Sequence, residues 1–196
     1  MLRFPLSFLS FAGFAFLTSS VAHAFDHGHT ALDRVLKQNV RDALASYSAL
    51  KADPAGLDDC LAQTATVTPA EFDGWTKNDR LAFLINLYNA ATVKLIADNS
   101  PLKSIRSIGW LPGAAWKKEV VGLFGRKISL DELELGIIRK TYGEPRAHFA
   151  LVCAALGCPP LREEAYVGAR LDEQLADQGR RFLGTGATVA AGAAAA

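Results

Sequence analysis

The apolar positions are densest in the middle of the chain, over residues 81–91, which read LAFLINLYNAA. Their spacing predicts a helix from Lys77 to Asp98, with Thr76 as its N-cap and a stop at residues 99–101, where Asn, Ser and Pro follow one another. Because apolar side chains occupy almost every side of this helix, we expect it to be buried at the centre of the fold.

Shorter helical patterns flank this central segment. Apolar residues recur at helical spacing over residues 31–50 and 171–183, and a short helix is expected around residues 57–61. Two capping boxes, in which Ser or Thr is followed three residues later by Glu, mark further helix starts at Thr68 and Ser129. The chain is therefore predicted to be mainly helical.

Two segments predict β-structure. Residues 117–121 and 126–129 flank a Gly-Leu-Phe-Gly turn and are typical of a hairpin. Residues 148–152, HFALV, form a short apolar run that we interpret as a strand leading into a tight cysteine loop. We expect an α+β fold with one mainly helical domain around the buried helix, and a small sheet formed by the hairpin and the cysteine strand.

The first 24 residues have the pattern of a signal peptide. An apolar run over residues 4–17 follows Arg3, and Ala22-His23-Ala24 has the small-x-small form of a signal peptidase site. We expect cleavage after Ala24, which would leave a periplasmic or secreted protein with no membrane span. An uncleaved N-terminal anchor is the alternative.

Composition describes a globular chain with balanced charge. Its 196 residues are 50% hydrophobic and carry 21 Lys and Arg against 20 Asp and Glu. This balance argues against a nucleic-acid partner, which would favour a basic surface. The part from residue 25 to 183 is long enough for one domain with its own core. Residues 184–196 are mostly Ala and Gly, and we expect them to form a disordered tail.

The reactive side chains concentrate in residues 146–160, RAHFALVCAALGCPP. One hypothesis is a thiol hydrolase or transferase in which Cys153 is the nucleophile and His148 the base that activates it. The two residues are five positions apart, so a regular strand would point them to opposite faces. The hypothesis therefore requires a bulge or turn before Cys153, or Cys158 as the nucleophile.

A structural disulfide between Cys153 and Cys158 is the alternative, because a tight loop in an exported protein can bring both cysteines together under oxidising conditions. His148 would then be a hydrogen-bonded core histidine. The third cysteine, Cys60, is interpreted as a packing residue of a short helix. A metal site would have only three ligands here, so we expect neither a metal nor another cofactor.

Asn86 and Asn89 interrupt the apolar helix three residues apart and share one face of it. A buried amide without a partner costs about 1 to 3 kcal/mol, so each must be hydrogen-bonded. In the catalytic hypothesis, one of them orients the imidazole or binds an oxyanion.

Arg146 and Tyr88 are the residues that we assign to substrate contact if the site is catalytic. The favoured interpretation of Arg146 is structural, as an ion-pair clamp to Glu134 or Glu132. A substrate carboxylate is its alternative partner.

Several segments together resemble one family. Residues 81–89 (LAFLINLYN), 129–134 (SLDELE) and 145–153 (PRAHFALVC), with the GCP of residues 157–159, are similar to the DUF547 family in sequence and order. The resemblance covers roughly residues 25–183. It implies a compact, mainly helical α+β domain, often exported in bacteria, with no established substrate.

The chain departs from the family pattern in two places. Leu84 stands where the family usually has tryptophan. Similar members also continue beyond the last helix with Trp-Tyr and Asp-Phe segments, whereas this chain ends in Ala and Gly. A truncation after about Leu183 would explain the difference and could remove a third catalytic group.

Two functional hypotheses follow for the exported domain. The first is a cysteine-dependent hydrolase or transferase built on His148 and Cys153. The second is a non-catalytic periplasmic binding or interaction module in which a Cys153–Cys158 disulfide holds a recognition loop. In either case the partner is expected to be a small molecule or a peptide, and the sequence leaves open whether the protein is an enzyme.

Overall fold

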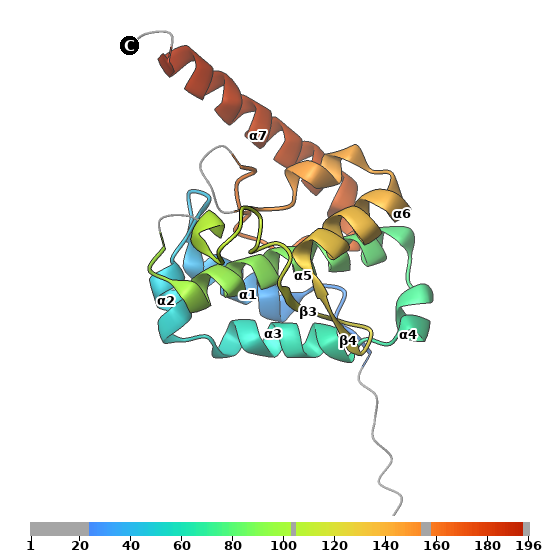
Figure 1. Ribbon diagram of the computed structural model, residues 1–196. Coiled ribbons are helices and arrows are strands. Elements are labelled where there is room, and N and C mark those ends of the chain that lie inside the picture. The colour runs from blue at the N-terminus through green and yellow to red at the C-terminus, as the bar shows by residue number, and fades with distance from the viewer. Residues whose placement is uncertain (1–23, 103–104, 154–157, 194–196) are drawn as a thin grey trace, which may run out of the picture.

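The computed structural model describes residues 24–102, 105–153 and 158–193, with only the backbone over 185–193. Helices of several kinds surround one long central helix, and two short antiparallel hairpins complete the fold (Figure 1). In chain order the elements are α1 (Thr30–Asn39), β1 (Val40–Arg41), β2 (Leu44–Ala45), α2 (Tyr47–Ala52), α3 (Ala55–Thr66), α4 (Pro69–Asp73), α5 (Lys77–Asn99), η1 (Ile105–Ser107), β3 (Glu119–Leu123), β4 (Arg126–Ser129), η2 (Glu132–Arg139), α6 (Lys140–Tyr142), η3 (Pro145–Phe149), η4 (Gly168–Arg170) and α7 (Leu171–Ala193).

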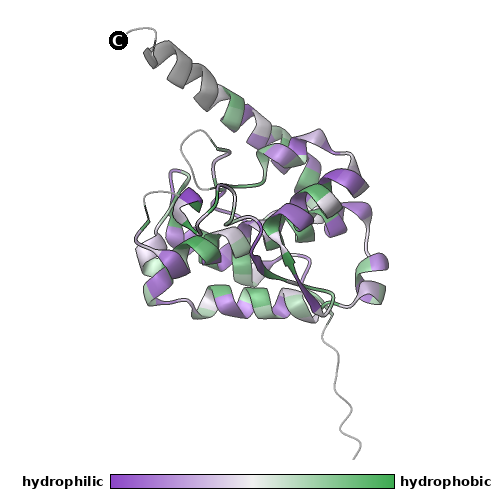
Figure 2. Ribbon diagram, viewed as in Figure 1, coloured by the Kyte–Doolittle hydropathy of each residue, from purple (hydrophilic) through white to green (hydrophobic). Residues whose placement is uncertain are grey.

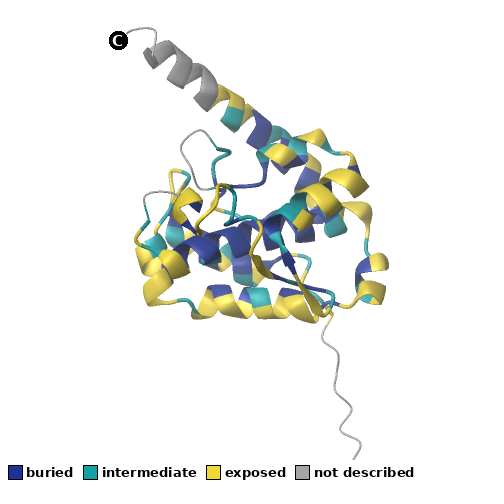
Figure 3. Ribbon diagram, viewed as in Figure 1, coloured by how far each residue is buried: buried dark blue, intermediate teal, exposed yellow. Residues whose placement is uncertain are grey.

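Helix α5 is the buried centre of the fold, as the sequence predicts. Phe83, Leu84 and Ile85 have no exposed surface, because α2, α3, β3, η2 and η4 pack around this helix. Figure 3 shows α5 as a buried segment among more exposed ones. The side chain of Thr76 caps it by accepting the backbone N–H of Asp79 at 3.1 Å.

Of the described helices, α5 alone is long and apolar enough to cross a membrane by length and composition, but 89% of its most apolar window is buried inside the fold. Burial of this kind identifies a core helix. The surrounding helices carry both apolar and polar residues (Figure 2), and their buried apolar residues form two core clusters that both include residues of α5.

Both predicted capping boxes begin helices. Thr68 accepts the N–H of Glu71 at 3.2 Å at the start of α4, and Ser129 accepts that of Glu132 at 3.1 Å before η2. The η2 segment is wound as a π-helix and continues into α6. Gly143 ends α6 in the left-handed conformation, with φ of 58°, which glycine adopts without steric cost.

The single helix predicted over residues 31–50 is wrong, because the chain turns back after α1. Asp42 and Ala43 have φ of 50° and 66°, and the turn pairs β1 with β2. The N–H of Ser46 then bonds to the carbonyl of Asn39 at 2.8 Å, and α2 begins. The sequence shows a continuous apolar pattern across this turn because Leu50 of α2 packs into the same core cluster as α1.

The strand predicted over residues 148–152 is also wrong. The segment begins as the 3₁₀-helix η3, because Pro145 occupies its first turn and the Glu144 side chain caps the N–H of Arg146 at 3.0 Å. Strands β3 and β4 pair antiparallel with each other, and in the described chain neither pairs with this segment. The small sheet is therefore the hairpin alone.

Helix α7 packs against η3 and η4 through its first turns, and its far end points away from the body (Figure 1). Its backbone remains helical through Ala193, past Leu183, where the sequence pattern predicts an irregular tail.

Candidate functional site around the cysteine loop

Cys153 and Cys158 form a disulfide, as one of the two hypotheses for this loop predicts. Their α-carbons are 5.9 Å apart, inside the range of roughly 4.4 to 6.8 Å that such bonds allow. The residues between them, 154–157, lie outside the described chain. In this oxidised state Cys153 has no thiolate with which to act as a nucleophile.

Asn89 fixes the segment that leads into the disulfide. Its side-chain nitrogen donates to the Ala150 carbonyl at 2.9 Å, and its side-chain oxygen accepts the N–H of Val152 at 3.1 Å. Because both ends of the amide bind backbone, Asn89 acts here as a clamp and contacts neither an imidazole nor an open oxyanion site.

Asn86 makes the same double contact one helical turn earlier. It donates to the carbonyl of Tyr166 at 2.7 Å and accepts the N–H of the same residue at 2.9 Å. The partners that sequence reasoning required for both buried amides are thus supplied by backbone far along the chain.

His148 lies on η3 and faces Glu134 of η2. The imidazole Nδ1 is 3.6 Å from Glu134 Oε1, and the His148 side chain is 64% exposed while that of Glu134 is 17% exposed. His148 is therefore not the core histidine of the disulfide hypothesis. The pair places a half-buried carboxylate beside an accessible imidazole, at a distance longer than a hydrogen bond.

Tyr88 lies on the inner side of the same carboxylate. Burial raises the pKa of Tyr88, and the charge of Glu134 together with a hydrogen bond to it raises that pKa further, against a hydrogen bond with Trp116 that lowers it. Since Tyr88 is only 2% exposed, it does not provide the direct substrate contact predicted for it. Glu134 thus links a buried phenol to a surface imidazole, a role that sequence reasoning missed.

Arg146 is a structural clamp, but with different partners from those predicted. It binds Glu144 through two side-chain hydrogen bonds of 2.8 and 2.7 Å and Asp172 through one of 2.8 Å. The hydrogen bonds from Arg146 hold the pKa of Glu144 below its usual value. The prediction of Glu134 or Glu132 as its partner is wrong, because Glu134 faces His148 and Glu132 pairs with Arg126 at 2.7 Å. The clamp joins η3 to α7.

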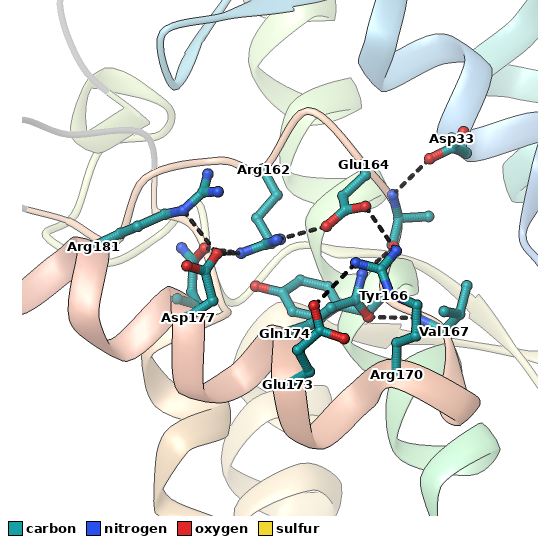
Figure 4. A network of polar contacts seen from close by, with 12 residues as sticks. Asp33, Arg162, Glu164, Tyr166, Val167, Arg170, Glu173, Gln174, Asp177 and Arg181 are labelled. Carbon is teal, nitrogen blue, oxygen red and sulfur yellow. Dashed lines mark hydrogen bonds and ion pairs between the residues drawn. The ribbon is translucent and has the colours of Figure 1, made fainter.

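A second polar network, absent from the sequence predictions, lies on the C-terminal side of the loop (Figure 4). The Arg162 side chain is 6% exposed and donates to Glu164 and Asp177, both at 2.6 Å. Burial alone would lower the pKa of Arg162, but these two hydrogen bonds outweigh it and raise that pKa. Asp177 also binds Arg181 at 2.8 Å, which ties the network to the side of α7.

The network continues to the backbone that follows Glu164. Gln174 bridges two backbone groups, donating to the Ala165 carbonyl and accepting from the Val167 N–H, each at 2.9 Å. Asp33 of α1 accepts the N–H of Ala165 at 3.2 Å. The segment after the cysteine loop is therefore held by α7 through Gln174, by α1 through Asp33 and by α5 through Asn86.

A hollow of about 350 Å³ lies beside the last residues of the loop. Gln178 forms part of its wall and donates to the carbonyl of Pro160 at 2.6 Å, which anchors the chain just after Cys158. Seven residues line the hollow: Asp42, Ala43, Pro160, Leu161, Glu163, Gln178 and Arg181. Within the described residues, no group of three or more His, Cys, Asp or Glu side chains is arranged to hold a metal ion.

The fold and site define a mainly helical α+β domain with a disulfide loop clamped to its central helix. The chain belongs to the family described as "Protein of unknown function, DUF547", whose model matches residues 72–183, more than half of its length. The matched region includes α5, the cysteine loop and the start of α7. Comparisons with curated proteins and with solved structures found no match.

Proposed function

We propose that the protein is an exported, non-catalytic binding module, and that its recognition surface is the disulfide loop with the adjoining hollow. The observation that carries the proposal is the disulfide in a loop held on both sides. Asn89 fixes Val152 before Cys153, and Gln178 fixes Pro160 after Cys158. Flanking segments that are already anchored in this way lose little conformational entropy when a partner binds beside them.

The chemistry of the hollow favours a small polar molecule or a short peptide as the ligand. Glu163 and Arg181 give its wall both signs of charge, while Pro160 and Leu161 add apolar surface. Pockets that combine apolar walls with a few polar groups are typical of small-ligand sites. Export into the periplasm or medium, after cleavage behind Ala24, is part of the same proposal.

The test is a thermal-shift screen of the oxidised mature protein against dipeptides and small charged metabolites. A ligand of the hollow should raise Tm, and the rise should grow with the logarithm of its concentration once that exceeds Kd. Glu163→Arg, which places a second cation beside Arg181, should abolish that shift. Glu173→Arg is the matched control, because Glu173 does not line the hollow. A ligand that binds both variants equally would contradict the proposed surface. If no compound in the screen raises Tm, the choice of ligand class would be contradicted.

A cysteine-dependent hydrolase or transferase is the second candidate, and the His148–Glu134 pair is the observation that favours it. After reduction of the disulfide, Cys153 would be the nucleophile and His148 the base, with Glu134 orienting the imidazole. Alkylation of the reduced protein, followed against pH, should then give Cys153 an apparent pKa well below about 8.5. Both His148→Ala and Glu134→Gln should slow that labelling at neutral pH. A labelling profile unchanged in both variants would exclude the catalytic dyad.

A further inference from the structure

The backbone nitrogen of Phe25 lies against a carboxylate. It donates to Glu71 Oε1 at 3.2 Å, although the two residues are 46 positions apart. Phe25 is also the residue that follows the expected signal peptidase site, and Ala24 before it is exposed. The nitrogen of the bond expected to be cut therefore already has an acidic partner.

The Phe25 side chain is packed into the body of the domain. Its ring centre lies 5.1 Å from that of Trp75, 5.2 Å from that of Phe83 and 5.2 Å from that of His29. Edge and tilted contacts at these distances are favourable for aromatic pairs. The ring thus holds the backbone nitrogen in place.

The next residues are fixed as well. The Asp26 carboxylate accepts the N–H of Gly28 and of Thr30, each at 2.8 Å, and so leads the chain into α1. From Phe25 onward the segment is consequently tied to the domain at its ring, its backbone and its first carboxylate.

The Glu71 side chain can accept from Phe25 because only one of the two hydrogen bonds of its capping box is formed. Its own N–H donates to Thr68, as a capping box requires. In the usual box the Glu side chain returns to the N–H of the capping residue. Here, within the described chain, Glu71 Oε1 is directed at Phe25 instead.

We propose that Glu71 is a binding site for the α-ammonium group of the mature chain, created when the signal peptide is removed. The inference rests on the proposed cleavage after Ala24. Hydrolysis of the Ala24–Phe25 bond gives the oxygen of water to the new Ala24 carboxylate, and the Phe25 nitrogen leaves as an amine that is protonated near neutral pH. The neutral amide donor at Glu71 becomes a cation, and its hydrogen bond becomes charge-assisted and stronger.

A double-mutant cycle tests the ion pair. One chain is released from a fusion so that it begins at Phe25, and the other begins at Val21, which keeps an uncharged amide at Phe25. Glu71→Gln is made in each, so that any effect on the capping box is common to both chains. We expect Glu71→Gln to lower Tm by about 2–4 °C more in the chain that begins at Phe25, as loss of roughly 1 kcal/mol would do in a domain of this size. Equal losses in both chains would overturn the proposal.

Two further measurements separate the parts of the inference. Selective acylation of α-amines should be slower in the chain that begins at Phe25 than in its Glu71→Gln variant, and an equal rate would also overturn the docking. The mass of the protein recovered after export reports the cleavage site independently. An N-terminus other than Phe25 would refute processing, whereas a Phe25 terminus without coupling to Glu71 would refute only the ion pair.

Discussion

Asn89 accepts the backbone N–H of Val152 at 3.1 Å, and this single contact connects the buried centre of α5 to the residue before the disulfide. The two residues are 63 positions apart. Because α5 is enclosed on nearly all sides, the backbone that leads to Cys153 is anchored to the buried core of the domain.

Replacing Asn89 should loosen the start of this loop. Asn89→Ala removes both of its hydrogen bonds and leaves a buried carbonyl and N–H unpaired, so we expect a loss of about 2–4 kcal/mol in the free energy of unfolding. Urea denaturation measures the loss, and hydrogen exchange should accelerate at the Val152 amide. Asn86→Ala is the matched control, with faster exchange at Tyr166 instead. Unchanged protection of Val152 in Asn89→Ala would show that the clamp is unimportant.

Two buried tyrosines should respond differently to loss of their hydroxyl groups. Within the described residues Tyr166 Oη has no hydrogen-bond partner, whereas Tyr88 is hydrogen-bonded to Glu134. Tyr166→Phe should leave stability within about 1 kcal/mol of the wild type, or raise it, because it removes an unpaired buried oxygen. Tyr88→Phe should lower stability by about 1–2 kcal/mol, because Glu134 loses a partner. Chemical denaturation of the two variants side by side decides this, and a larger loss in Tyr166→Phe would indicate an ordered water at that hydroxyl.

Removing the disulfide should lower the free energy of unfolding by about 2 kcal/mol. The value is at the low end for such bonds because this disulfide closes a short loop, and the entropy that a disulfide removes from the unfolded chain grows with loop length. Cys153→Ser, Cys158→Ser and the double variant should have nearly the same urea midpoint, since any one of them breaks the same bond. Cys60→Ala should respond to reductant as the wild type does, because Cys60 is buried and free. Additive losses in the two single variants would show that each cysteine contributes by packing.

His29 should make the protein sensitive to acid. Burial lowers the pKa of His29 to about 4, against a smaller opposing effect of Asp26. Above pH 6.5 the histidine is neutral in both the folded and the unfolded chain. Below that pH the unfolded chain binds the proton first, so stability falls until the folded histidine also titrates near pH 4. The loss should reach about 3 kcal/mol.

The stability of His29→Gln should therefore depend less on pH between 6.5 and 4. Thermal unfolding of both proteins across this range gives the difference in their stability at each pH. The contributions of carboxylates that both proteins share cancel in that difference. If His29→Gln and the wild type had parallel pH profiles, the buried histidine would not be responsible for the acid sensitivity.

The sequence by itself determined the elements that depend on near neighbours. The central helix follows from an apolar surface on all sides, and Thr76 caps it because the hydroxyl and the N–H of Asp79 are three residues apart. The disulfide was also within reach of the sequence, as one of two alternatives, because Cys153 and Cys158 are close along the chain.

Only the tertiary structure decided the course of residues 145–152 and the partners of their side chains. An apolar run this short is compatible with a strand or a helical turn, and the choice depended on the cap at Glu144 and on the absence of a neighbouring strand in the described chain. Glu134 could have paired with Arg146 or His148, and Asn89 could have faced a ligand or backbone. Contacts between side chains and partners 60 or more residues away depend on how the helices pack, and the local spacing of residues does not predict them.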